Sequence, residues 1–216
     1  KDKQTLLFSA TIHGMVAHMI EKFLNNPVKI EVESNVDPAK LKQGYYDVQD
    51  NLKYSLLVNL LKKEESGLVM VFCNTRHNTD FIANNLSGNG IDAEAIHGGF
   101  TQKKRNRILE KFHTQKVLTL VCTDVAARGL DIQDVSHIYN YDVPTDPKDY
   151  IHRIGRTARA GKEGKAISLV AERDKDHFKK VIEVNKVEIR KKTLPKFEFI
   201  KTDYKIKRDY KKKNRN

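Results

Sequence analysis

Cysteine is scarce in this sequence, which contains only Cys73 and Cys122. Each of the two ends a short apolar run, and the CxxC spacing of zinc ribbons and redox sites does not occur. This pattern predicts buried, reduced thiols in a cytoplasmic protein rather than a disulfide framework. The eight histidines are scattered without the spacing of metal ligands, so we expect no metal site.

Long hydrophobic runs are absent as well. No window reaches the roughly 18 apolar residues that a membrane span requires, and no secretory leader is visible. We therefore expect no membrane partner. The hydrophobic residues, 39% of the 216, nevertheless suffice for one packed domain with extensions.

The excess of positive charge is concentrated at one end of the chain. The formal net charge is +12, and residues 186–216 hold 13 Lys and Arg against 4 Asp and Glu. Such an end indicates nucleic acid or another polyanion as partner. There Phe197, Phe199, Tyr204 and Tyr210 alternate with lysines. This composition suits stacking on bases, and it equally suits a disordered, solubilising end.

Short apolar runs alternate with helix-like stretches through the middle of the chain. Asn74 or Thr75 can cap the helix after the first run, and Asp146–Pro147 is a strong helix start. Strands that alternate with helices predict an α/β fold, a parallel sheet covered on both faces. The predicted strands are 68–72, 91–96, 117–122, 135–141 and 165–170.

The two ends differ from this body. The first residues read as one strand ("TLLFSA", 5–10), one helix (about 13–25) and one strand ("VKIEV", 28–32), before a polar stretch. After Pro195 the composition turns to lysine and spaced aromatics. We therefore divide the chain into the end of a preceding domain (1–33), a linker (34–40), a main domain (41–195) and a basic tail (196–216).

The stretch "YIHRIGRTARAG" (150–161) holds three arginines and no acidic residue. On a continuous helix, His152, Arg156 and Arg159 would share one face, but Gly155 can instead end the helix and leave the last two on a loop. Close guanidinium groups repel each other unless an anion lies between them, and their forks match phosphate oxygens. The stretch indicates a phosphate site; the alternative is a basic patch paired with nearby acids.

Two further stretches suit the same kind of ligand. "CTDVAARGLDI" (122–132) follows a strand, where open parallel sheets bind ligands, and Asp131 can accept a hydrogen bond from a ribose hydroxyl. "HGGFTQKKR" (97–105) places two glycines before a helix N-terminus, with Gln102 and Arg105 on one face. The alternative for the latter is an ordinary glycine turn and a solvated basic face.

A phosphate-binding loop is missing. Gly155 and Gly161 are separated by five residues where that loop has four, and Glu163 follows Lys162 where serine or threonine is required. The apolar strand with an acid at its end, "LTLVCTD", therefore lacks the loop that a magnesium role would need. The chain offers arginines for a phosphate that it cannot hold by itself.

The motifs together resemble those of the DEAD-box RNA helicases, in order and in spacing, over residues 5 to about 185. They are "SAT" (9–11), "VFCNTR" (71–76), "HGG" with "QKKR" (97–105), "TDVAARGLDI" (123–132) and "HRIGRTARAG" (152–161). In that family the phosphate loop and the Asp-Glu-Ala-Asp segment lie in the first of two RecA-like domains. This sequence therefore resembles the second, C-terminal half.

The resemblance implies a RecA-like parallel sheet flanked by helices on both faces, and an ATP-dependent RNA helicase as the full-length protein. The implied partners are RNA and the N-terminal RecA-like domain of the same protein. ATP and Mg²⁺ belong to the complete enzyme, with none expected on this chain alone, which is predicted to be inactive by itself. The resemblance leaves the oligomeric state open.

The resemblance also implies roles for single residues. Arg159 matches the arginine finger, Arg156 a second arginine at the γ-phosphate, and His152 completes the catalytic set. The other implied contacts are to ATP by Gly129 and Asp131, to the partner domain by Arg128, Arg153, Ser9 and Thr11, and to the RNA backbone by Thr75, Arg76, Gly98, Gly99, Gln102, Arg105 and Thr123.

Two positions depart from the family pattern. Ala158 stands where most members have glycine, and Gly99 where an acid is common. The methyl group of Ala158 is tolerated unless the position needs a positive φ, which would cost on the order of 1 kcal/mol. Two alternatives remain: a standalone RNA-binding or regulatory module, and a DNA-unwinding relative, although such relatives usually carry glutamine where His152 stands.

Overall fold

The computed structural model describes residues 3–9, 12, 14–30, 40–63, 67–128, 130, 132, 135–158 and 162–203. The chain divides into two compact units, Lys1–Ser34 and Asn35–Asn216. None of the helices in the described ranges is long and apolar enough to cross a membrane.

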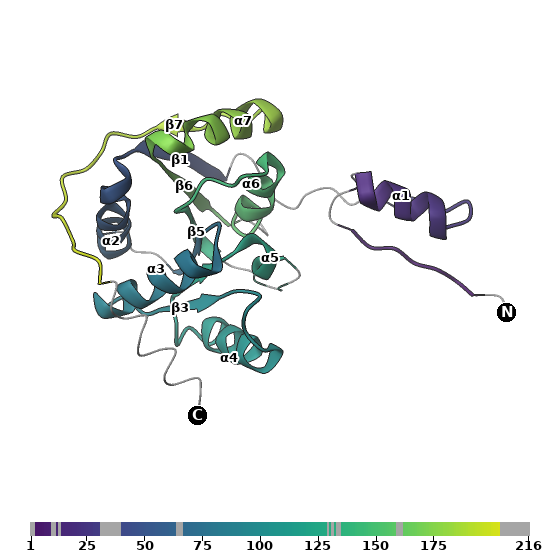
Figure 1. Cartoon of the computed structure of the whole chain (residues 1–216), viewed down its shortest axis with the longest axis horizontal. Helices are drawn as coiled ribbons and strands as arrows, with labels where there is room; N and C mark the ends of the chain where they lie inside the picture. Colours follow the sequence, from purple (N-terminus) through teal and green to yellow (C-terminus); the bar gives the residue numbers. More distant parts are fainter. Residues whose placement is uncertain are drawn as a thin grey trace. The chain divides into compact units, whose positions relative to one another are not determined.

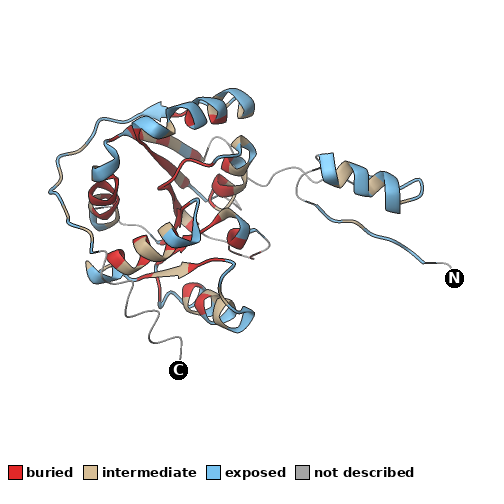
Figure 2. Ribbon diagram, in the orientation of Figure 1, coloured by how far each residue is buried: buried red, intermediate tan, exposed pale blue. Residues whose placement is uncertain are grey.

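The smaller unit consists of helix α1 (Gly14–Phe23) and extended segments on either side of it. Its described residues form no core: α1 buries no residue, as the absence of red on this helix in Figure 2 shows, and Phe8 and Val28 are 89% and 88% exposed. The two strands predicted around α1 are wrong for residues 5–9 and 28–30, the described parts of these ranges. A strand needs a neighbouring strand for its backbone hydrogen bonds, and the described residues of this unit offer none.

The larger unit is built on one sheet of seven parallel strands (Figure 1), in the order β3-β4-β2-β5-β6-β1-β7. The predicted α/β fold with a parallel sheet is therefore confirmed. The strands are β1 (Leu41–Asp47), β2 (Leu68–Phe72), β3 (Ala93–Ile96), β4 (Thr119–Cys122), β5 (Val135–Asn140), β6 (Gly164–Val170) and β7 (Arg190–Lys191).

Helices cover both faces of this sheet, as Figure 1 shows. They are α2 (Lys53–Lys63), α3 (Arg76–Gly88), α4 (Gln102–His113), α5 (Asp124–Ala127), α6 (Pro147–Ile154) and α7 (Lys175–Asn185), with 3-10 turns at Asp50–Leu52 and Glu172–Asp174. The side chains of α2 and α3 share one apolar cluster with the sheet, and those of α4 to α7 share the other. Successive residues of β2 alternate between the two clusters, because side chains of a strand point to opposite faces.

The local signals for the helix starts act as predicted. The Asn78 amide donates to Thr75 Oγ1 at 3.0 Å, so Thr75 rather than Asn74 caps α3. The Lys148 amide donates to Asp146 Oδ1 at 2.9 Å at the start of α6. Cys73 and Cys122 are free and buried, and burial raises the pKa of both thiols.

Gly155 decides the alternative that the arginine-rich stretch left open. Helix α6 ends at Ile154 with Gly155 as its C-cap, so Arg156 lies beyond the helix. Ala158 follows with a φ of 53°, the left-handed conformation in which a methyl group is strained. The substitution at position 158 therefore carries the cost of on the order of 1 kcal/mol that was expected for a positive φ.

The start of the predicted tail belongs to the larger unit. Phe197 and Ile200 pack against the cluster shared by α2 and α3. The Ile200 amide donates to Ser55 Oγ at 2.9 Å, and the Asp203 amide donates to Asn85 Oδ1 at 2.7 Å. Residues 196–203, which the prediction assigned to the tail, thus pack on the larger unit through Phe197 and Ile200. Tyr204 and Tyr210 lie outside the described residues.

Candidate functional site

Three neighbouring strands place polar residues at one edge of the sheet. Asp124 follows β4, Asn74 follows β2, and Asp142 comes shortly after β5. Because the strands are parallel, these residues stand at the same edge, where ligands bind in open α/β sheets. Most of the predicted site residues of the larger unit belong to the loops and helix starts at this edge.

Two of the predicted RNA contacts are neighbours in space. Arg76 begins α3 and is exposed, and its guanidinium lies over the glycine turn before α4. A Cβ atom at Gly98 would come within 3.5 Å of Arg76 Nη2, and one at Gly99 within 3.0 Å of the His97 ring. The absence of side chains at the two glycines therefore leaves room for Arg76 and for His97. An acid in place of Gly99 would crowd that ring.

Helix α4 brings a second pair of predicted contacts to the same edge. Arg105 Nη1 donates to Gln102 Oε1 at 3.3 Å, which confirms that the two share one face. Arg105 Nη2 also donates to the Ala126 carbonyl at 3.4 Å, which joins α4 to α5. Thr123, at the start of α5, is 8% exposed, so little of its surface is open to a ligand. Thr101 Oγ1 accepts from the Lys104 amide, so one of the amides expected to be open is capped.

Burial and nearby charged groups set the protonation of His152. Arg128 forms an ion pair with Asp149. Burial lowers the pKa of His152 below its ordinary 6.5, and the nearby Arg128 and Arg156 lower it further. Burial raises the pKa of Asp149, with Asp124 adding to the rise and Arg128 opposing it. The His152 ring is therefore neutral at neutral pH and can accept a hydrogen bond.

Arg156 is half-buried beside the segment that was expected to contact ribose. Its Nη1 donates to the Leu130 carbonyl at 2.8 Å, one residue before Asp131. Ser9 lies exposed in the smaller unit. Four predicted site residues lie outside the described residues: Thr11, Gly129, Asp131 and Arg159.

Arg153 differs from its neighbours because its side chain is fully buried. Its Nε and Nη2 donate to the two carboxylate oxygens of Asp124 at 2.6 and 2.7 Å. Its Nη1 donates to the Asp142 carbonyl at 2.6 Å and to Asn140 Oδ1 at 3.2 Å. Its Nη2 also donates to Asn74 Oδ1 at 2.9 Å.

The predicted contact of Arg153 with a partner domain stays a prediction, and the structure gives this side chain partners within its own unit. A guanidinium has five N–H donors, and every one of them has an acceptor inside this unit. None of the four residues that supply these acceptors was predicted as a site residue. The available signal was their position: Asn74, Asp124 and Asp142 are polar residues just after strands, and Asn140 is the last residue of one.

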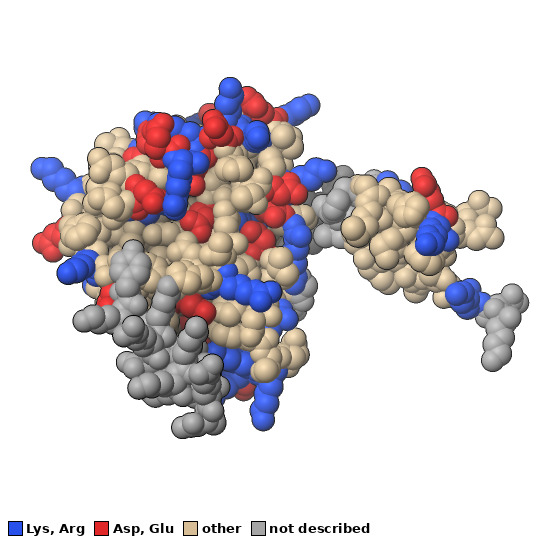
Figure 3. Space-filling view, viewed as in Figure 1, with Lys and Arg blue, Asp and Glu red and all other residues tan. Residues whose placement is uncertain are grey.

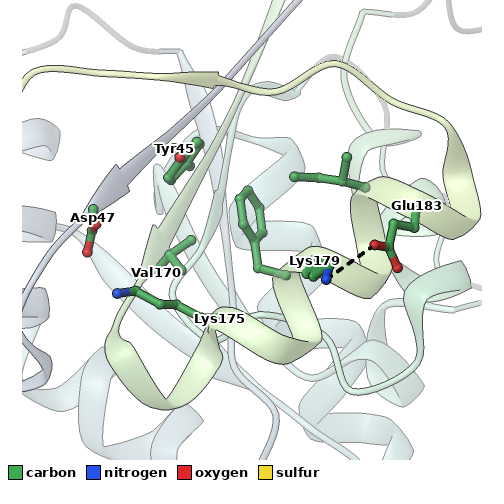
Figure 4. Close-up of a pocket in the computed structure, with 8 residues that line it drawn as sticks. Tyr45, Asp47, Val170, Lys175, Lys179 and Glu183 are labelled. Atoms are coloured by element: carbon green, nitrogen blue, oxygen red, sulfur yellow. Dashed lines mark ion pairs between the residues drawn. The ribbon is translucent and has the colours of Figure 1, made fainter.

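One cavity of the larger unit lies apart from these residues. A cavity of about 300 Å³ opens between the ends of β1 and β6 and helix α7, with Tyr45, Val170 and Lys175 in its wall (Figure 4). None of the predicted site residues lines it. Within the described ranges, no three His, Cys, Asp or Glu side chains gather closely enough to hold a metal ion. Among the described residues, the predicted site residues therefore lie outside this cavity.

The comparisons with known proteins agree on one family. The family model of the helicase conserved C-terminal domain matches residues 52–161. The DEAD-box ATP-dependent RNA helicase CshA of Bacillus licheniformis is 41% identical over 86% of this chain and 38% of its own length. For CshA of Listeria monocytogenes the identity is 44%, over 86% of this chain and 36% of its own length. The chain thus spans well under half the length of these relatives.

Solved structures confirm the RecA-like fold and the family. A DEAD box protein from Methanococcus jannaschii superposes with a TM-score of 0.68 at 36% identity, covering 89% of this chain and 52% of that one. Dbp5 of S. cerevisiae, bound to RNA and ADP BeF3, superposes with a TM-score of 0.78 at 32% identity, with the coverage again 89% and 52%. The chain belongs to the DEAD-box RNA helicase family and carries its C-terminal, RecA-like domain.

Proposed function

We propose that the full-length protein is an ATP-dependent RNA helicase in which this chain forms the second lobe. The lobe binds the RNA backbone and presents Arg156 and Arg159 to an ATP that the N-terminal domain holds with Mg²⁺. Closure of the two domains then joins the arginines to the γ-phosphate. RNA that spans both domains favours closure, so hydrolysis is coupled to the unwinding or remodelling of RNA.

The observation that carries this proposal is the gathering of candidate RNA contacts at one edge of the sheet, with the candidate ATP contact Arg156 in the turn that ends α6. Arg76 lies over Gly98, Arg105 reaches α5, and Arg156 is tied to the Leu130 carbonyl. Figure 3 shows lysine and arginine atoms gathered over α4, beside this edge. Cationic side chains and helix starts contact phosphates without reading sequence, so the predicted binding is independent of RNA sequence.

We assign different roles to the two domains because this chain has no phosphate loop. Without a phosphate loop, it supplies charge stabilisation in the transition state but no grip on the β- and γ-phosphates. Support comes from Dbp5, a relative at 32% identity whose structure holds RNA and ADP BeF3. An arginine supplied in this way accelerates hydrolysis by about 10³ to 10⁵.

The first test replaces the arginine finger in the full-length protein. Arg159→Ala is expected to lower the RNA-stimulated ATPase rate by about 10³ or more, with little change in ATP affinity. The rate is measured by phosphate release, and the affinity by titration with a fluorescent nucleotide. A variant that keeps more than about a tenth of the wild-type turnover would show that the finger is misassigned.

A second test asks whether this chain depends on the missing lobe. The chain alone is expected to bind RNA without hydrolysing ATP, and to support hydrolysis when the N-terminal domain is supplied in trans. Binding without any such rescue would favour the standalone RNA-binding module. Parallel assays with RNA and DNA duplexes on the complete enzyme separate an RNA helicase from a DNA-unwinding relative.

A further inference from the structure

The buried guanidinium of Arg153 joins loops that are far apart in the sequence. Its acceptors Asp124, Asn140 and Asn74 are 29, 13 and 79 positions away. The side chain is fully buried, and its charge is balanced by the carboxylate of Asp124 in a two-pronged ion pair. The guanidinium carbon also lies 5.1 Å from the ring centre of Phe72. A group held in this way has one position only.

Two of these acceptors belong to the loops that carry candidate RNA contacts. Asn74 directly precedes Thr75 and Arg76, and Asp124 directly follows Thr123. Asn74 is itself held by Asp142: its amide donates to Asp142 Oδ2 at 3.0 Å. Its side-chain amide donates to the Val143 carbonyl at 2.8 Å. The RNA-facing loop after β2 therefore cannot shift without disturbing the hydrogen bond between Asn74 and Arg153.

Arg153 is also bonded to Arg156, the candidate ATP contact, through its backbone. The backbone amide of Arg156 donates to the Arg153 carbonyl at 3.2 Å, in the turn that ends α6. The Arg156 side chain leaves this turn toward the Leu130 carbonyl. One residue thus has its side chain bonded to the RNA-facing loops and its backbone bonded to the ATP-facing turn.

We propose that Arg153 is a positioning residue that holds the RNA-contact loops and the Arg156 turn in one fixed relation, so that binding of RNA and binding of ATP are coupled through it. The inference rests on the function proposed above. A closed arrangement must satisfy RNA and ATP at the same time. If the RNA contacts and the ATP contacts of this lobe moved independently, each ligand could still bind alone. Binding of one ligand would then strengthen binding of the other less.

Lysine cannot reproduce this arrangement. It keeps the positive charge opposite Asp124, but it has three donors on one nitrogen where arginine has five in a planar fork. At least two of the five acceptors then lose their partner, and the tie to Asn74 or to Asn140 is broken. Arg153→Lys therefore tests positioning while it leaves the buried carboxylate with a counter-charge.

The experiment measures the affinity of the full-length protein for a non-hydrolysable ATP analogue, with and without saturating single-stranded RNA. In the wild type, RNA is expected to tighten analogue binding by a factor between about 5 and about 150. In Arg153→Lys this factor is expected to fall below about 2, while the affinity for analogue alone changes less than about threefold. A factor in Arg153→Lys that stays at the wild-type value overturns the inference.

Two further variants separate positioning from stability. Val181→Ala opens a cavity in the buried face of α7, a helix that supplies none of the Arg153 acceptors, and is expected to lower stability but to keep the coupling factor. Asn74→Ala removes the hydrogen bond between Arg153 and the RNA-facing loop, together with the one from Asn74 to the Val143 carbonyl, and is expected to lower the factor. If Arg153→Lys does not fold, unchanged coupling in Asn74→Ala overturns the inference. A wild type without any RNA dependence contradicts the proposed function itself.

Discussion

Arg153 and Arg156, only three positions apart, occupy different environments. The first is buried with all its donors bonded, and the second is half-buried beside the Leu130 carbonyl. The end of α6 at Ile154 separates them, because residues beyond the helix no longer follow its periodicity. Of these two arginines in one motif, Arg153 thus stabilises the structure, whereas Arg156 is a candidate ligand contact.

His152 carries a prediction about pH. Its pKa is lowered in the folded chain, first by burial and then by Arg128, so the unfolded chain binds the proton more readily. The free energy of unfolding should therefore fall as the pH drops from about 6.5 toward the lower, folded value. His152→Gln should remove this part of the dependence, measured by urea unfolding between about pH 7.5 and about pH 5.5.

The control for this prediction is His177→Gln, at an exposed position on α7. If His152→Gln and the wild type lose stability equally over this range, burial of the ring does not disfavour its protonation in the folded chain.

Strand β6 begins close to Thr157 and Ala158, the residues just beyond the end of α6, and Gly164 is needed there. A Cβ atom at this position would lie 2.6 Å from the Ala158 backbone nitrogen and closer still to the Thr157 hydroxyl. Thr157 cannot move aside, because its hydroxyl donates to the Val135 carbonyl. The close approach of β6 to the loop is thus possible only without a side chain.

Gly164→Ala is accordingly expected to lower the free energy of unfolding by about 1 to 3 kcal/mol, through overpacking. Gly67→Ala, just before β2, is the matched control. There the new Cβ meets Ser136 Oγ at 3.6 Å, an ordinary van der Waals distance, and the change should stay below about 1 kcal/mol. Equal midpoints for the two variants in thermal unfolding would refute the packing argument.

The larger unit includes residues 196–203, which follow β7. Truncations before and after this segment should therefore have different effects on stability and on RNA binding. Residues 196–203 pack along α2 and α3, whereas 204–216 hold seven Lys and Arg and one Asp. The first segment is expected to contribute to stability, and the charge of the second is expected to favour binding of phosphates.

Removal of 204–216 should leave the thermal midpoint unchanged and weaken RNA binding. The slope of log affinity against log salt should become shallower by about 0.7 for each phosphate that these residues no longer neutralise. Removal of 196–216 should in addition cost about 2 to 3 kcal/mol of stability, because the apolar side chains of Phe197 and Ile200 no longer cover the cluster. A salt slope that does not change in either truncation would leave the end of the chain a solubilising extension.

Much of the fold was predictable from short-range pattern. Apolar runs, helix caps at Thr75 and Asp146, and the stop at Gly155 depend on neighbours within four residues, so the sequence alone determined them. The motifs determined the family in the same way. The assignment of single residues to RNA and ATP stays a prediction. The flanking strands were mispredicted, because a strand depends on a partner that local pattern does not contain.

Only the tertiary structure decided which polar residues meet. The order of the strands places Asn74, Asp124 and Asp142 at one edge. The Arg153 side chain, which comes from α6, forms hydrogen bonds with all three. These hydrogen bonds depend on the crossover connections between parallel strands. Amino-acid composition therefore does not predict them. The reason is physical: periodicity records which face of an element is buried, whereas the partners of a buried charge are set by how the elements pack.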